Sequence, residues 1–132
     1  MPKSGDRVLD SQLLVLFAGR NACADGKTAN SSLFPSDHRL RISCDAAQDP
    51  AHAQKRFDSH PDRIGKAPSV AAFGVTAGEI RSVDHRLLVE HAPLNGNPEH
   101  CEIKFPEGHS KGERRRISKQ PASMASKRGP LT

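Results

Sequence analysis

The chain has 132 residues, a formal net charge of +5, 35% apolar and 4% aromatic residues, and neither Trp nor Tyr. This length allows one domain with one core, and the composition makes that core thin and largely aliphatic. The longest apolar run, residues 13–18, is far shorter than the roughly 20 residues that a membrane helix needs, so we expect no membrane contact. Because charged residues make up 27% of the chain, disorder is the competing interpretation, but alternating patterns in the middle of the chain argue against it.

The positive charge is concentrated at the end of the chain. From residue 110 onward, seven basic residues and one acid give a net charge of +6, which leaves −1 on residues 1–109. The positive field therefore comes from the last segment, which we treat separately from a nearly neutral body.

Cysteine usage indicates the compartment. The three cysteines are an odd number without a CxxC pair, so a disulfide framework is not expected and a reducing cytosol fits better. The apolar run over residues 13–18 lacks the basic leader and the small-residue cleavage site that we expect of a secretory signal. We predict a soluble, cytoplasmic protein.

The first half of the chain predicts two strands and one helix. We expect a flexible N-terminus over residues 1–12, a buried strand over residues 13–17, and a half-solvated strand over residues 39–44, where apolar and polar residues alternate. If residues 31–34 paired with residues 13–17, Asp25-Gly26 would lie near the hairpin bend. Asp49 and Pro50 are typical of a helix start, and the helix should run to about Ser59 with Phe57 as its anchor.

The second half predicts three strands and two helices. Residues 69–75, 86–91 and 100–105 have strand patterns, and Thr76 with Glu79 forms a capping box for a short helix after the first of them. A second capping box, Ser110 with Glu113, opens a C-terminal helix that Pro121 should kink or stop.

Together these elements predict a small α+β domain. We expect a mostly antiparallel sheet with two or three helices on one face, including the helix from Asp49 and the basic C-terminal helix. The core domain would span residues 13–109, and the basic helix or tail residues 110–132.

Residues 40–44, 70–79 and 93–103 resemble a group of small uncharacterised bacterial proteins that carry a "gVTvgE" segment, then "DPLPxNPxHAxI", then a basic helix. This chain departs from the pattern at Ala92, Cys101 and Pro121. The resemblance implies a bacterial origin and, from operon neighbours of some members, a protein partner encoded nearby. It implies no established activity.

Two catalytic or metal-binding patterns deserve comparison with simpler interpretations. His91 and His100 could face each other across a hairpin and hold zinc, but their spacing matches no ligand signature, and surface histidines are the default. Asp62, Glu102 and Lys104 imitate the PD…(D/E)xK pattern of metal-dependent nucleases, whereas a solvated strand face explains Glu102 and Lys104 equally simply. We expect no cofactor.

The C-terminal helix provides the main candidate for binding. Its basic residues recur at helical spacing and form a stripe that can neutralise phosphates: Lys111, Arg114, Arg115, Arg116 and Lys119. A solvated helix face is the alternative, and no aromatic residue near the stripe in sequence offers a stacking surface. Three functions remain open: a non-enzymatic accessory module of a bacterial complex, a nucleic-acid-binding protein, and a metal-dependent hydrolase.

Overall fold

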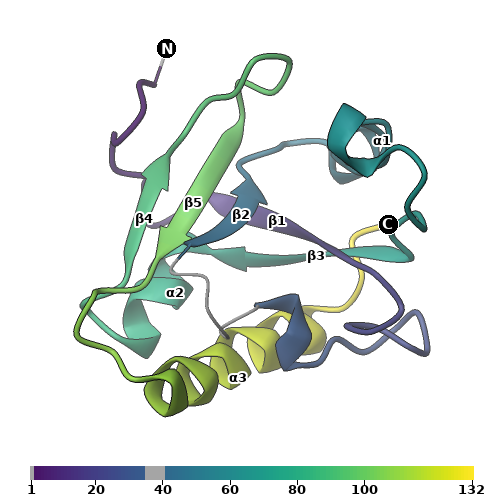
Figure 1. Ribbon diagram of the computed structural model, residues 1–132. Coiled ribbons are helices and arrows are strands. Elements are labelled where there is room, and N and C mark those ends of the chain that lie inside the picture. Colours follow the sequence, from purple (N-terminus) through teal and green to yellow (C-terminus); the bar gives the residue numbers. More distant parts are fainter. Residues whose placement is uncertain (1, 35–40) are drawn as a thin grey trace.

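The computed structural model describes residues 2–34 and 41–132, which form a five-stranded sheet with helices on both faces (Figure 1). This confirms the predicted α+β class. In chain order the elements are β1 (Leu13–Ala18), the 3₁₀ turn η1 (Ser31–Leu33), β2 (Arg41–Asp45), α1 (Pro50–Asp58), the 3₁₀ turn η2 (Pro61–Arg63), β3 (Ala71–Thr76), α2 (Ala77–Val83), β4 (Leu88–His91), β5 (His100–Lys104) and α3 (Lys111–Arg128). Arg39 and Leu40 of the predicted second strand lie outside the described residues.

The strands lie in the order β3-β1-β2-β5-β4, and every neighbouring pair is antiparallel. β1 therefore has β2 on one side and β3 on the other, so no edge is free for residues 31–34. Those residues form η1 instead, because the side chain of Asn30 accepts a hydrogen bond from the amide of Ser32 and starts a tight turn. The hairpin considered from the sequence is not formed.

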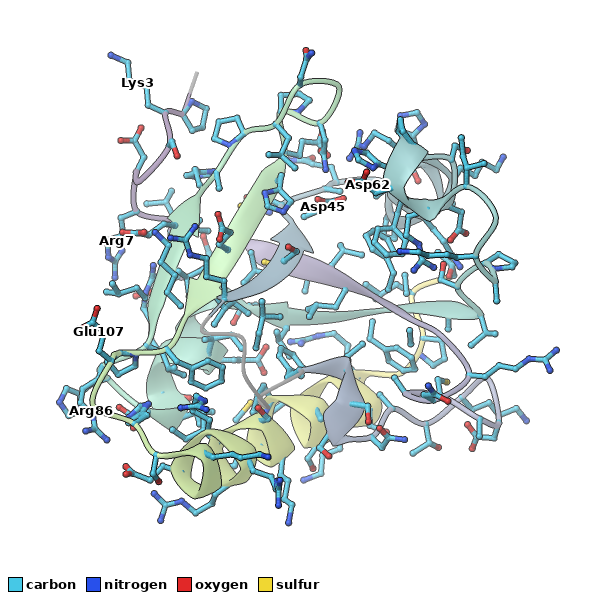
Figure 2. All side chains as sticks on the ribbon, in the orientation of Figure 1. Lys3, Arg7, Asp45, Asp62, Arg86 and Glu107 are labelled. Atoms are coloured by element: carbon cyan, nitrogen blue, oxygen red, sulfur yellow. The ribbon has the colours of Figure 1, made fainter. Side chains whose placement is uncertain are left out.

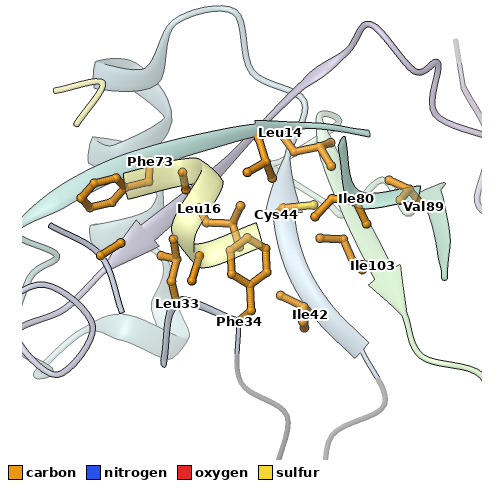
Figure 3. Close-up of a cluster of buried hydrophobic side chains, with 14 of the residues drawn as sticks. Leu14, Leu16, Leu33, Phe34, Ile42, Cys44, Phe73, Ile80, Val89 and Ile103 are labelled. Atoms are coloured by element: carbon orange, nitrogen blue, oxygen red, sulfur yellow. The ribbon is translucent and has the colours of Figure 1, made fainter. Parts of the chain in front are cut away.

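One face of the sheet is closed by α2 and α3. Alternate residues of every strand point to this face and form one apolar cluster with the two helices (Figure 3). Leu14, Phe73 and Ile80 are among its fully buried side chains. The capping boxes at Thr76 and Ser110 are both present and fix where these helices begin.

The other face is covered by α1 over part of its width only. Val15 and Ala72 face α1 and form a second, smaller cluster with Ala47 and Ala53. The expectation that the helix from Asp49 shares a face with α3 is therefore wrong. Alternation along a strand exposes two faces, and the sequence of a short helix does not say which face it covers.

Both outer edges of the sheet carry hydrogen bonds to segments near the chain ends. Beside β4, the amide of Val8 donates to the carbonyl of Val89 at 3.1 Å, and Val8 is fully buried. Beside β3, the amide of Leu131 donates to the carbonyl of Ala72 at 2.7 Å. Such cover reduces the tendency of exposed edges to pair with other chains. The flexibility predicted for residues 1–12 stays a prediction.

The C-terminal helix continues through Pro121 rather than stopping there, and the alternative expectation, a kink at this residue, stays a prediction. Ile117, Pro121, Ala122 and Ala125 are buried against the sheet. Packing along this face offsets the hydrogen bond that proline removes. Within the described parts of the chain, none of the helices has the length and apolarity needed to cross a bilayer.

Candidate functional site

Three side chains form a layered stack on the side of the sheet that carries α1. The rings of Phe17, from β1, and Phe57, from α1, are stacked with centroids 4.5 Å apart and an interplanar angle of 22°. The guanidinium carbon of Arg63, from η2, lies 4.5 Å from the centroid of the Phe57 ring. Cation–π attraction and ring stacking hold these groups together. The buried residue of α1 is Ala53, whereas Phe57 is half-buried, so the expectation that Phe57 anchors the helix stays a prediction.

A groove of about 710 Å³ opens beside this stack. The stack and residues 66–68 line one part of it, the turn after β1 another, and η1 with α3 the rest. Four cationic side chains contribute to the lining: Arg20, Arg63, Lys66 and Arg115. We refer to this feature as the basic groove.

Local hydrogen bonds fix the wall of the basic groove formed by the turn after β1. The side chain of Asn30 donates to the carbonyl of Asn21 at 2.8 Å and accepts from the amide of Ser32 at 2.8 Å. The amide of Ala29 donates to Ser126 Oγ of α3 at 3.3 Å. One asparagine therefore joins the turn to η1, and the same loop is tied to the long helix.

The electrostatics of the basic groove are one-sided. No acidic residue lines it, and in the described parts of the chain no ion pair joins any of its four cations to a carboxylate. Other arginines of the same chain are neutralised, as Arg81 is by Asp10 at 2.6 Å. Like charges gathered in a concave site attract anions and raise their local concentration.

A second cleft, of about 230 Å³, shares Phe17, Phe57 and Arg63 with the basic groove. It lies between α1 with η2 and the uncovered part of the sheet, and Asp45 and Asp62, which are labelled in Figure 2, both line it. Its remaining polar lining comes from Ser43, Asp45, Arg56, His60, Asp62, Asn97 and His100. We refer to it as the polar cleft.

The centre of the polar cleft is a buried carboxylate. Asp45, only 4% exposed, accepts a hydrogen bond from Asn97 Nδ2 at 2.9 Å and lies 3.5 Å from Arg56 Nη2. Arg56 also lies 3.4 Å from Glu99. A charge removed from water in this way needs such partners. The two partners also fix the orientation of Asp45.

The residues of the predicted basic stripe do not share one environment in the structure. Arg115 lines the basic groove, whereas Arg114 turns inward and donates to the carbonyl of His109 at 2.8 Å. Lys111, Arg116 and Lys119 are exposed and do not line the groove. Of the predicted stripe, Arg115 alone lines the basic groove, and the other three cations of the lining come from distant parts of the sequence.

The two histidines considered as zinc ligands are not brought together. The register pairs His91 with Cys101, whose Sγ lies 3.7 Å from His91 Nδ1, so His100 points to the opposite face. His100 Nδ1 lies 2.8 Å from the carbonyl of Ala92, which confirms its interpretation as a turn histidine. In residues 2–34 and 41–132, no three His, Cys, Asp or Glu side chains are arranged to hold a metal ion.

The nuclease-like residues are separated as well. Glu102 and Lys104 lie on the same face of β5, as predicted, and pair with Arg41 at 3.6 Å and Glu90 at 2.7 Å respectively. Asp62 lines the polar cleft, which neither of them lines. The hydrolase hypothesis stays a prediction without a geometric argument in its favour.

The thiols of β2 and β5 are poor nucleophiles. Cys44 and Cys101 are directly opposite each other and buried. Burial raises the pKa of the Cys101 thiol to about 11 and raises that of Cys44 well above its usual value. Both thiols therefore remain protonated near neutral pH, in the unreactive form.

No protein-family model, curated protein or solved structure matches this chain. The resemblance to small bacterial proteins consequently stays a prediction. The geometry of the two clefts is the basis for a functional assignment.

Sequence reasoning missed both clefts. Arg20, Arg63 and Lys66 lie in loops or short turns without periodicity, and Phe17 and Phe57 are 40 residues apart in the numbering. The available signal was modest: Phe57, Arg63 and Lys66 follow one another at short spacing near the end of α1. The gathering of these side chains depends on the pairing of β1 with β3, which a local pattern does not encode.

Proposed function

We propose that this protein is a non-enzymatic module that binds nucleic acid through the basic groove. The observation that supports the proposal is the set of four cations without an acidic neighbour in the lining, next to a stack of two phenylalanine rings. Cations neutralise the phosphates of a strand, and aromatic or guanidinium planes give its bases a stacking surface.

The shape of the site favours single strands. The cations lie around a concavity rather than along one exposed helix face, and Arg63 caps an aromatic stack within it. Bases of a duplex are already stacked on one another, whereas bases of a single strand are free to contact such a stack. The role as an accessory module with a protein partner encoded nearby stays a prediction.

The test is fluorescence anisotropy with a labelled single strand of about 10 nucleotides, titrated over a series of salt concentrations. We expect the logarithm of the binding constant to fall linearly with the logarithm of salt, with a slope of about −0.7 for each phosphate neutralised. Replacing Arg20, Lys66 and Arg115 by alanine should weaken binding and reduce the slope by about 2. These side chains are exposed, so the fold should be retained.

A matched control changes the same charge outside the groove. Arg116, Lys119 and Lys127 are exposed residues of α3 that do not line it, and replacing all three by alanine should leave most of the affinity. Equal losses in the two triple variants would mean that the helix stripe, and not the groove, carries binding. No measurable binding by the unaltered protein at low salt would overturn the proposal.

A further inference from the structure

The polar cleft contains buried polar atoms that the fold leaves without partners. Among the described residues, Arg56 Nε and Asn97 Oδ1 are buried and make no hydrogen bond, and both residues line the cleft. A buried donor or acceptor without a partner costs about 1–3 kcal/mol. A ligand that supplies those partners removes this cost.

The two histidines add one donor and one acceptor. His60 Nδ1 accepts a hydrogen bond from the amide of Asp62 at 3.2 Å, so the proton of the neutral ring is on Nε2. His100 Nδ1 faces the carbonyl of Ala92, which only accepts, so Nδ1 carries the proton and Nε2 is an acceptor. The residues that line the cleft therefore include both ring donors and ring acceptors.

The size and walls of the cleft restrict the ligand to a small, flat group. Its 230 Å³ is below the range of about 300–1,000 Å³ that is typical of pockets for larger ligands. Phe17, Phe57 and Arg63 supply aromatic and guanidinium surfaces on the side shared with the basic groove. A heteroaromatic ring with polar edges meets both conditions.

We infer that the polar cleft binds a nucleobase, guanine in particular, of a strand whose phosphates lie in the basic groove. The inference rests on the proposed function and names the part of the ligand that the second cleft takes. Guanine offers two adjacent donors next to one acceptor. Asp45 and Asn97 Oδ1 can accept from those donors, while Arg56 donates to the carbonyl oxygen.

The route between the two sites is short because they have a common wall. Phe17, Phe57 and Arg63 line both cavities, so a phosphate near Arg63 and a base on the other side of the stack belong to neighbouring parts of one nucleotide. Bases turned out of a single strand are recognised in this way, by stacking on arginine or aromatic planes and by hydrogen bonds to their edges.

The experiment compares three labelled thymidine strands of about 10 nucleotides: one unmodified, one with a central guanine and one with a central abasic site. The guanine strand should bind at least about fivefold more tightly than the abasic strand, the ratio that corresponds to about 1 kcal/mol. Asn97→Ala should lower the affinity of the guanine strand to that of the abasic strand, because it removes Oδ1 and releases Asp45.

Asn95→Ala is the matched control, since Asn95 is an exposed residue of the same turn and does not line the cleft. Circular dichroism and thermal melting of both variants establish that the turn is retained. Equal binding of the three strands, or a guanine preference that survives Asn97→Ala, would overturn the inference while leaving binding through the basic groove intact. Failure of all three strands to bind would instead overturn the proposed function.

Discussion

The two faces of the sheet are built from the same five strands, but one is covered by apolar packing and the other carries polar groups without hydrogen-bond partners. On the face of α2 and α3, Leu14, Phe73 and Ile80 are fully buried in one continuous apolar cluster. On the face of α1, the apolar cluster is small, and next to it a buried carboxylate and unpartnered polar atoms line the polar cleft. The basic groove opens at the border of this face, where η1 and Arg115 of α3 complete its lining. The first face stabilises the domain, and the second is available for a ligand.

Small residues in β3 leave room for the C-terminal segment on the second face. A Cβ atom at Gly74, in the middle of β3, would lie 2.9 Å from side-chain carbons of both Leu13 and Leu131. Real Cβ atoms do not approach other atoms so closely, so glycine allows the C-terminal segment to pack along the second face. Ala72, two residues earlier in β3, belongs to the small cluster against which Leu131 packs.

The largest expected effect is on the free energy of unfolding, which should depend more on side chains of the first face than on those of the second. Phe73→Ala should lower the free energy of unfolding by about 3–5 kcal/mol, because it leaves a cavity in the closed core. Phe57→Ala should cost clearly less, since Phe57 is only half-buried and its contacts are with Phe17 and Arg63. Urea denaturation followed by circular dichroism measures both values, and equal losses would contradict the distinction between the faces.

A smaller effect concerns the helix starts. Thr76→Ala should cost about 1 kcal/mol, because Thr76 Oγ1 accepts from the amide of Glu79 at 3.1 Å and the Glu79 carboxylate accepts from the Thr76 amide at 2.8 Å. Asp49→Ala, at the start of α1, removes a single exposed bond of 3.3 Å and should cost less. Thermal melting of the two variants checks the order, and the reverse order would show that α1 contributes more to stability than its packing indicates.

A further effect is a dependence of stability on acid. Hydrogen bonds from the Arg86 side chain and backbone amide lower the pKa of Asp84 from 3.8 to about 2. The unfolded chain then binds this proton more readily than the folded chain, so stabilisation present above pH 3.8 is lost as the pH falls toward 2. Asp84→Asn should flatten the stability profile over this interval in urea titrations at several pH values. A profile as steep as that of the unaltered protein would assign the acid sensitivity to other carboxylates.

Local patterns in the sequence predicted most of the elements but not how they assemble. Alternation located β2, β4 and β5, a short apolar run indicated β1, and the capping boxes at Thr76 and Ser110 located two helix starts, because these signals involve residues within one turn or one strand. The passage of α3 through Pro121 and the placement of α1 on the second face depend on packing between distant segments. The basic groove depends on the same long-range packing, so only Arg115 of its four cations was among the predicted binding residues.

The most direct test of the central claim, that the basic groove is the binding surface, is a titration of the ¹⁵N-labelled protein with a short single strand, followed by amide chemical shifts. We predict the largest changes in residues 19–22, 31–32 and 66–67, which line or flank the basic groove. Changes confined to the exposed surface of α3 around Arg116, Lys119 and Lys127, with the groove amides unaffected, would contradict it.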